Sequence, residues 1–204
     1  MKIEIIDIGK KLYPDAVEIF TEAFSEDTLF RFAFPDFEQR KRLTKVMYEF
    51  VVYNMVPKLN LTINGVTEGN ELAGCMIYTT PDSVPWSDSM MGSLEKMSAK
   101  ARDERINFIG QFATLSGYEP DVPYLYVNEL AVRNQFRGQG LGKALINDII
   151  GRSENNSGSK GILLDTANKN NVAIYEKFGW TLKSTLPFYD INKFFLWREN
   201  KIHK

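Results

Sequence analysis

The chain has 204 residues, of which 44% are hydrophobic, with 25 basic against 26 acidic residues. This size suits one domain, and this share of apolar residues suffices for a sizeable core. The balanced charge gives no electrostatic case for nucleic acid or an anionic membrane as a partner. Early acidic residues, Glu4 and Asp7, argue against a signal peptide, and no run of about 18 apolar residues would span a membrane. We therefore expect a cytoplasmic protein.

Cysteine and histidine are scarce. The only cysteine, Cys75, lies in an apolar stretch that predicts a buried strand, so a core role without a disulfide is expected. The only histidine, His203, lies one residue from the C-terminus. Because a nucleophilic cysteine needs a base beside it, these counts argue against histidine-assisted triads and cysteine–histidine metal sites. We expect no metal.

Hydrophobic periodicity predicts helices and strands along the whole chain. The first half should hold a strand, a helix opened by Pro14, a phenylalanine-rich loop or short helix, a second helix and a hairpin turning at Gly69-Asn70, over residues 3–8, 14–24, 24–35, 38–54, 59–63 and 71–79. The second half should hold a helix bent near Arg105, a strand, a helix, a strand, a short helix and two closing strands, over residues 93–115, 124–132, 140–150, 161–166, 172–178, 180–186 and 194–198. No repeat or linker divides the chain, so residues 1–204 are expected to form one domain.

The most informative stretch is the turn between the strand over 124–132 and the following helix. It reads Arg137-Gly138-Gln139-Gly140-Leu141-Gly142-Lys143. Glycines let a phosphate approach the backbone closely, and the first N–H groups of a helix are unpaired and partly positive. A pyrophosphate therefore fits here, with Arg137 and Lys143 offsetting its charge.

Three interpretations of this turn compete on spacing: an unliganded strand-to-helix turn, a nucleotide site and a coenzyme A pyrophosphate site. A P-loop would need a glycine at Arg137 and a serine or threonine at Ala144. A dinucleotide fingerprint would want a small residue at Lys143. Both nucleotide templates therefore fit poorly.

The segment Arg137 to Gly142 resembles the Arg/Gln-x-x-Gly-x-Gly/Ala signature of the GNAT superfamily of acyl-CoA-dependent N-acyltransferases. Downstream, Asn171 to Trp180 resembles the superfamily's element in which an asparagine precedes Tyr-Glu and then Gly-aromatic. The specific resemblance covers about Tyr124 to Trp180. It implies an α/β fold with a mixed, mostly antiparallel central sheet, splayed at the cofactor cleft and flanked by helices.

The resemblance also implies acetyl-CoA as co-substrate, with its pyrophosphate on the turn Arg137 to Lys143. The pantetheine arm would lie between the splayed strands over 124–132 and 161–166 and pair with free backbone groups of the segment Leu130-Ala131-Val132. Asn171 would cap the short helix, contact the cofactor, or do both.

Two residues are the expected catalytic groups. Tyr175, four residues after Asn171 and so on the same helix face, would protonate the leaving sulfur, unless it only packs. Glu129 would accept the proton of the amine, unless it lies on a solvated face or forms an ion pair. Strand alternation predicts that Glu129 shares a face with Val127 and Ala131.

These features predict acetyl transfer from acetyl-CoA to a primary amine by direct attack in a ternary complex. The alternatives are a coenzyme A-binding sensor without turnover and an enzyme that acylates a hydroxyl. Acidic and aromatic residues between Ser25 and Phe37, among them Glu26 and Asp27, favour a small-molecule cationic amine over a folded protein, unless this loop only covers the core. Trp86 and Tyr118 are further acceptor-site candidates. The oligomeric state, including a homodimer, stays open.

Overall fold

A seven-stranded sheet forms the centre of the computed structural model, which describes residues 2–84, 92, 96–97, 103 and 105–201. The strand order is β1-β2-β3-β4-β5-β7-β6. The β4–β5 pair is parallel and the other described pairs are antiparallel, so the predicted mixed sheet is confirmed. The strands are β1 (Ile3–Asp7), β2 (Thr62–Glu68), β3 (Glu71–Thr79), β4 (Leu125–Val132), β5 (Gly161–Thr166), β6 (Thr181–Phe188) and β7 (Ile191–Glu199).

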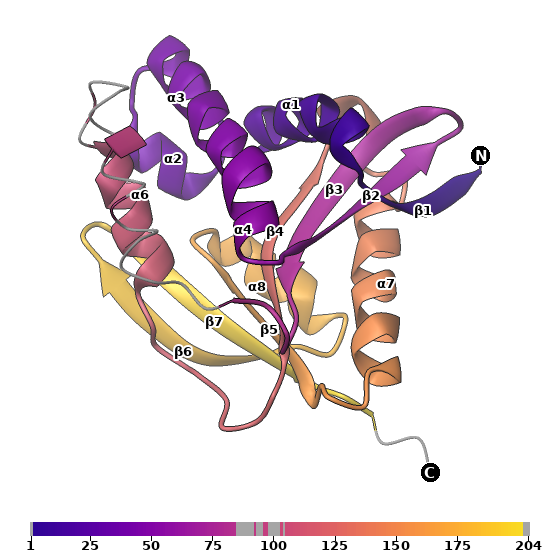
Figure 1. Cartoon of the computed structure of the whole chain (residues 1–204). Coiled ribbons are helices and arrows are strands. Elements are labelled where there is room, and N and C mark those ends of the chain that lie inside the picture. The colour runs from indigo at the N-terminus through magenta and orange to yellow at the C-terminus, as the bar shows by residue number, and fades with distance from the viewer. Residues whose placement is uncertain (1, 85–91, 93–95, 98–102, 104, 202–204) are drawn as a thin grey trace.

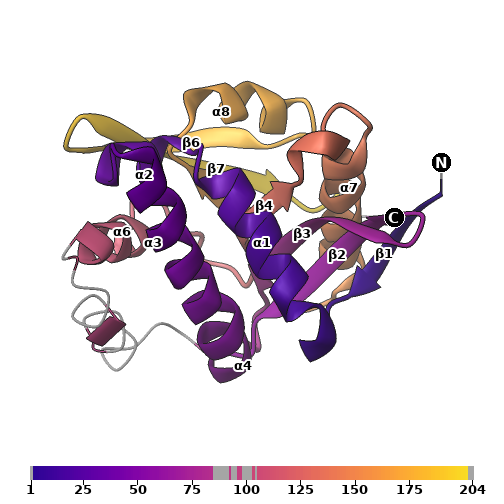
Figure 2. The ribbon, with the colours of Figure 1, turned by 90° about the horizontal axis from the view of Figure 1, so that it is seen from above.

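Helices cover both faces of this sheet (Figures 1 and 2). One face carries α1 (Tyr13–Phe24), α2 (Thr28–Ala33), α3 (Phe37–Phe50) and α6 (Arg105–Thr114). The other carries α7 (Leu141–Asn155) and α8 (Lys169–Glu176). A π-helical turn (Val51–Met55) continues α3 into the short α4 (Val56–Lys58), and 3-10 turns at Lys10–Leu12 and Asn134–Phe136 precede α1 and α7.

The predicted elements are found with shifted ends. The phenylalanine-rich stretch forms the short helix α2, because Asp27 caps it by accepting the N–H of Leu29 at 2.9 Å. The predicted helix over 38–54 is α3 together with its π turn. The predicted helix over 93–115 is described as α6, and most of its earlier part lies outside the described residues, as do Trp86 and His203.

One extra residue interrupts the pairing of β4 with β3. Ile77 lies opposite Glu129 and Tyr78 lies opposite Val127, which leaves Asn128 as a β-bulge. A bulge bends its strand and lets two neighbouring positions point to the same side. The regular alternation predicted for this strand therefore breaks at Asn128.

The bulge corrects one prediction about Glu129. Val127 packs in the core on the α7 side of the sheet, whereas Ala131 packs in the core on the α1 side. Glu129 shares the face of Ala131, because both lie beyond the bulge and are two residues apart. Glu129 and Val127 thus point to opposite faces, and the prediction that they share one is wrong.

The strands β4 and β5 separate just before the bulge. Their described pairing runs from Leu125 opposite Ile162 to Val127 opposite Leu164. Beyond that point β4 continues along β3 to Val132, while the end of β5 stays paired with β7. The predicted splay between these strands is confirmed.

Cys75 lies in β3 as a free thiol with no exposed surface. Burial raises its pKa well above the ordinary value, so the thiol stays protonated. The predicted core role is confirmed. In the described part of the chain, no helix is long and apolar enough to cross a bilayer.

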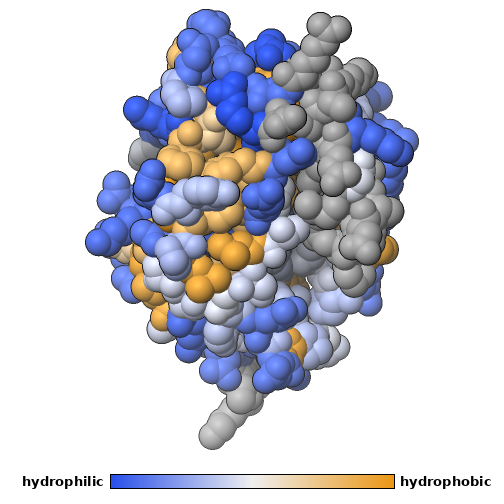
Figure 3. Space-filling model, turned by 90° about the vertical axis from the view of Figure 1, so that its left-hand side faces the viewer, coloured by the Kyte–Doolittle hydropathy of each residue, from blue (hydrophilic) through white to orange (hydrophobic). Residues whose placement is uncertain are grey.

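Aromatic contacts join α2, α6 and the β6–β7 hairpin. Figure 3, which views the molecule from the left-hand side of Figure 1, shows a hydrophobic area framed by hydrophilic side chains. The ring of Phe108 on α6 lies 5.4 Å from that of Phe32 on α2 and 4.6 Å from that of Phe188 on β6. Such ring pairs stabilise the contact beyond the area that they bury. These ring contacts hold α6 against the β6–β7 hairpin at one edge of the sheet.

Candidate functional site

A cavity of about 210 Å³ lies where β4 and β5 separate. Its wall comes from the end of α1 and the segment before α2, from α2, α3 with its π turn, α6, β3, β4, β5 and α8. Much of this wall is apolar, with Phe24, Leu29, Phe30, Met47, Val51, Met55, Leu61, Ile109 and Phe112. Six acidic or phenolic side chains also line it, namely Asp27, Glu129, Asp165, Tyr48, Tyr126 and Tyr175. Apolar walls with a few converging polar groups are typical of small-molecule sites.

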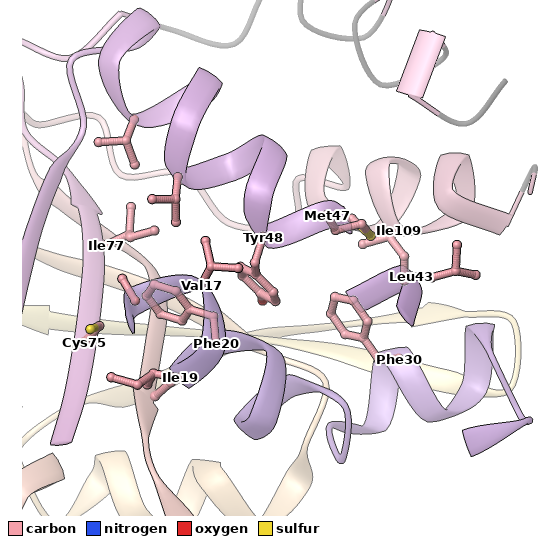
Figure 4. Packing of buried hydrophobic residues seen from close by; sticks show 14 of the residues in the cluster. Val17, Ile19, Phe20, Phe30, Leu43, Met47, Tyr48, Cys75, Ile77 and Ile109 are labelled. Carbon is pink, nitrogen blue, oxygen red and sulfur yellow. The ribbon is translucent and has the colours of Figure 1, made fainter. Parts of the chain in front are cut away.

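Glu129 projects into the cavity from β4, and its carboxyl group is hydrogen-bonded to a tyrosine of α3. The hydroxyl of Tyr48 donates to its Oε2 at 3.0 Å. Tyr48 is 2% exposed, and its ring stacks on Phe20 at 5.1 Å within the packed core between α1 and α3 (Figure 4). The position of the Glu129 carboxyl is therefore fixed by a rigid partner.

The electrostatics of the cavity make Glu129 a weak acid. Burial raises its pKa from 4.5 to about 8; the hydrogen bond from Tyr48 acts against this rise, and the charges of Asp165 and Asp27 add to it. A carboxyl group with such a pKa can gain or lose a proton near neutral pH.

Asp165 on β5 has two partners. It accepts a hydrogen bond from the hydroxyl of Tyr126, and its Oδ1 lies 3.4 Å from the Nζ of Lys193 on β7. Burial raises the pKa of Asp165 and lowers that of Lys193, and the attraction between the opposite charges counters both shifts. The protein thus supplies a cation for this carboxylate.

Lys193 also caps the C-terminal end of helix α6 from its place in β7. It is 1% exposed, and its ammonium donates to three carbonyl oxygens at the end of that helix, at 2.9, 3.1 and 3.0 Å, those of Phe112, Ala113 and Leu115. A cation at a helix C-terminus satisfies carbonyls that have no partner within the helix. The same side chain therefore holds the α6 wall of the cavity and the Asp165 carboxylate.

The two acids predicted for the acceptor site have different surroundings. Asp27 lines the cavity, and burial raises its pKa. Glu26 is exposed and forms ion pairs with Arg31 at 3.5 Å and Arg40 at 3.8 Å. Tyr118 is not among the residues that line the cavity. Asp27 is therefore the predicted acceptor-site acid that the structure brings to the cavity.

Tyr175 and Asn171 both reach the cavity from α8, as their spacing predicts. The ring of Tyr175 lies 5.8 Å from that of Trp180, and burial raises the pKa of the phenol to about 12. Because of this raised pKa, Tyr175 keeps its proton at any ordinary pH. The Nδ2 of Asn171 donates to the Oγ1 of Thr166 at 3.1 Å.

The cap of α8 is a different asparagine from the one predicted. Asn168 precedes the helix, and its side chain accepts the N–H of Asn170 at 3.0 Å. Asn171 lies inside the helix, so the prediction that it caps α8 is wrong. Its side chain is directed instead to the end of β5.

Backbone groups of β4 face the opening between the strands. The N–H of Arg133 donates to the carbonyl of Ala73 on β3 at 2.9 Å, which fixes the phase of that ladder. Alternate residues of a strand direct their backbone groups to opposite neighbours. Leu130 and Val132 lie an odd number of residues before Arg133, so their backbone N–H and C=O groups point away from β3 and toward β5. The described pairing of β4 with β5 ends at Val127, so β5 does not pair with these groups there.

The glycine-rich turn forms a second hollow beside the end of β4. Gly138 and Gly140 have φ values of +77° and +87°, and a Cβ at either would meet no neighbour within 4 Å. The left-handed backbone, rather than crowding, is what favours glycine there. The hollow is lined by Val132, Phe136, Arg137, Gly138, Gly140, Leu141, Gly142 and Lys143.

The start of α7 leaves donors available at this hollow. The N–H of Ala144 is the first to donate to the Gly140 carbonyl, at 2.9 Å, so the preceding N–H groups from Leu141 to Lys143 begin the helix without helical acceptors. Such N–H groups bind anions. Gln139 supports the turn instead, because its Nε2 donates to the Gln135 carbonyl at 3.2 Å.

Sequence reasoning missed four polar residues of this site. Tyr48, Tyr126, Asp165 and Lys193 come from α3, β4, β5 and β7, and each one taken alone fits a core or strand position. Their partners lie far away in sequence, for example 81 residues between Tyr48 and Glu129. The one local signal was the charged Lys193 directly before the apolar run from Phe194 to Trp197 in the same strand.

Comparison with known proteins adds to this geometry. The model of a family described as the acetyltransferase (GNAT) family matches residues 12–180. No curated protein matches the chain. The structure is similar to that of the histone acetyltransferase HPA2 and related acetyltransferase from Corynebacterium glutamicum, with a TM-score of 0.74 and 17% identity over 100% of this chain and 99% of that chain.

Two further structures have the same fold. Agmatine N-acetyltransferase has a TM-score of 0.61 and 14% identity, over 98% of this chain and 100% of that chain. NAA60 from Arabidopsis thaliana, in complex with a bisubstrate analogue, has a TM-score of 0.56 and 15% identity, over 97% and 98%. Because the family model spans the cavity, the turn and Tyr175, the chain belongs to the acetyltransferase (GNAT) family and is an acyltransferase.

Proposed function

We propose that this enzyme transfers the acetyl group of acetyl-CoA to a primary amine of a small molecule, by direct attack in a ternary complex. The observation that carries the proposal is the convergence of Glu129 from β4 and Tyr175 from α8 on one cavity where β4 and β5 separate. One group is suited to accept a proton near neutral pH and the other to donate one.

The residues around the turn suit acetyl-CoA. Its pyrophosphate would bind the N–H groups and the two basic side chains from Arg137 to Lys143. Its pantetheine arm would pair with the backbone of Leu130 and Val132, with Ala131 between them turned to the core, and would pass Asn171 and Tyr175. The bound thioester would supply the activated acyl group.

Glu129 would accept the proton that the amine must lose. An alkylamine has a pKa of about 10 and is almost wholly protonated at neutral pH, so its lone pair is blocked. A carboxylate in an apolar cavity both attracts the ammonium and takes its proton. The freed lone pair then forms the bond to the acyl carbon.

Tyr175 would donate a proton to the sulfur as the carbon–sulfur bond breaks. Its raised pKa keeps the phenol protonated until that moment. The ammonium loses two protons in all, one to Glu129 before the attack and a second from the nitrogen to solvent once the bond to the acyl carbon has formed. The second proton offsets the one that Tyr175 gives to the sulfur, so the products are an amide and a free thiol, with the first proton left on Glu129. Solvent can restore both groups afterwards.

Two observations support direct transfer over the alternatives. Cys75, the lone thiol, is buried in β3 with a raised pKa, and it is not among the residues that line the cavity. Two carboxyl groups of the cavity, those of Asp27 and Glu129, form no ion pair among the described residues, and they favour a cationic amine over a neutral hydroxyl as acceptor. A sensor without turnover would need neither Glu129 nor Tyr175.

A screen of primary amines with acetyl-CoA tests the proposal directly. Purified protein is incubated with each amine, the released thiol is measured, and mass spectrometry identifies the acetylated product. Turnover with a small amine and no acetylated Cys75 supports the proposal. Binding of acetyl-CoA without turnover on any amine favours the sensor, and faster acetylation of alcohols or protein lysines rejects the stated acceptor.

The Gly140→Val variant should weaken coenzyme A binding by about tenfold or more, a loss of about 1.4 kcal/mol. The branched side chain would occupy the hollow and strain the left-handed backbone. Isothermal titration calorimetry measures the affinity. Gly69→Val is the matched control, because Gly69 has a φ of +61° and equally open space but lies in the β2–β3 turn. Equal affinities in the two folded variants would contradict the pyrophosphate site.

The Tyr175→Phe variant should keep its affinity for acetyl-CoA and lose about 10²-fold or more in turnover number, because it keeps the ring and removes the proton. Steady-state kinetics with a single-turnover measurement separates chemistry from product release. Tyr124→Phe, whose ring packs on Trp197 away from the cavity, is the control and should match the parent. An unchanged chemical step in Tyr175→Phe would reject the general acid.

We expect kcat/KM of the parent to rise through about pH 8, as Glu129 ionises, and the Glu129→Gln variant should lose this rise. Its remaining rate should climb only at higher pH, as the amine ionises by itself. Tyr48→Phe removes a hydrogen bond that lowers the pKa of Glu129, so its rise should move to higher pH. Asp27, Asp165 and Tyr126 also face Glu129 and stay in place in both variants.

Stability gives an independent readout of the same ionisation. The folded pKa of Glu129 is raised, so ionisation opposes folding and the parent loses stability as pH rises from 4.5 to about 8. The neutral Glu129→Gln side chain avoids this loss, which is of order 5 kcal/mol for a rise of the pKa from 4.5 to about 8. Urea unfolding across this range measures it. Parallel pH profiles of parent and variant, in rate and in stability, would show that Glu129 does not titrate there.

A further inference from the structure

We propose that the acceptor is a diamine, with the reacting amine beside Glu129 and a second ammonium held by Asp27. The inference rests on the proposed function, because it names the substrate class of the same cavity. Three carboxyl groups line this cavity, and no lysine or arginine is among the described lining residues.

One of the three carboxylates is already neutralised by the protein. Asp165 lies 3.4 Å from the ammonium of Lys193 and accepts from Tyr126. Asp27 and Glu129 take part in none of the ion pairs formed by the described residues. A buried carboxylate without a cation is costly, and a ligand that brings one ammonium for each would offset that cost.

Asp27 is held in place before any ligand binds. Its Oδ1 accepts the N–H of Leu29, and the segment around α2 is fastened at both ends by the buried Arg40 of α3. The guanidinium of Arg40 donates to the carbonyl of Ser25 at 2.5 Å and to that of Phe34 at 2.8 Å. A preorganised carboxylate binds a cation without the cost of ordering a loop.

The cavity also offers a surface for the carbon chain between two ammonium groups. The rings of Phe24 and Phe30 lie 6.1 Å apart in its wall, beside Leu29 and Met47. Such side chains pack against methylene groups, and aromatic faces attract ammonium groups. A short diamine has this composition, with an apolar middle and charged ends.

A separate observation points to a ligand with N–H donors. The Oδ1 of Asn128, the bulge residue, is buried and accepts no hydrogen bond among the described residues, and Asn128 lines the same cavity. A buried acceptor without a donor is destabilising. An ammonium has three N–H donors, so it can donate to a carboxylate and to this amide oxygen at the same time.

The first experiment compares three series of matched acceptors with acetyl-CoA. These are straight-chain α,ω-diamines, monoamines of the same length, and aminoalcohols in which a hydroxyl replaces the second ammonium. We expect kcat/KM for the best diamine to exceed that for both matched compounds by about tenfold or more, as one added charge-assisted hydrogen bond allows. Equal values for the diamine and the aminoalcohol would overturn the inference.

The second experiment removes the charge of Asp27 and keeps its cap. Asparagine and serine both cap helices well, so Asp27→Asn and Asp27→Ser should fold. Each should lose most of the preference for the diamine over the monoamine. Asp36→Asn is the matched control, because Asp36 caps α3 in the same way, accepting the N–H of Gln39 at 2.8 Å at an exposed site that does not line the cavity. It should keep the preference.

The outcomes separate this inference from the proposed function. Thiol release with monoamines and diamines alike, and no change of preference in either Asp27 variant, would reject the diamine and leave amine acetylation standing. No turnover with any amine would reject the proposed function itself, and the diamine with it. A tenfold preference that Asp27→Asn and Asp27→Ser both lose, and Asp36→Asn keeps, supports the inference.

Discussion

The bulge at Asn128 is the constraint on which the site depends. One extra residue in β4 turns Glu129 to the side of the sheet that α1 and α3 cover, where Tyr48 can reach it. The same irregularity lies where the pairing of β4 with β5 stops. A bulge bends and twists its strand, so the two strands separate there. A regular β4 would place Glu129 on the α7 side and leave no opening between the strands.

Sequence reasoning succeeded where the physical requirement is local. The turn from Arg137 to Lys143 needs glycines with left-handed backbones and an amphipathic helix behind them, and these appear as a short run of residues. The pair Asn171 and Tyr175 needs only one turn of helix to share a face. The order of strands and helices could be predicted in the same way, because buried residues recur about every 3.6 positions in a helix and about every two positions in a strand.

The parts that sequence reasoning missed are those that long-range packing decides. Asn128 sits in a stretch whose residues otherwise alternate, and its place as the bulge follows only from the register with β3. Tyr48 falls on the apolar stripe of α3, where a tyrosine is expected to pack. The pairing of Asp165 with Lys193 joins two antiparallel strands whose separation in sequence carries no signal. Each is a polar group that becomes informative only once its buried partner is known.

The site separates opposite charges along β4. At the end of this strand the start of α7, with Arg137 and Lys143, offers positive charge to an anion. Near the bulge, Glu129 and Asp27 offer negative charge to a cation, whereas Asp165 is paired with Lys193. Under the proposed function both ends are needed at once, because a ternary complex would bring an anionic cofactor and a cationic amine to one strand. The nearly neutral chain therefore holds two local charge groups of opposite sign. Under the proposed function each group would attract one of the two substrates, and the separation would keep the amine away from the pyrophosphate.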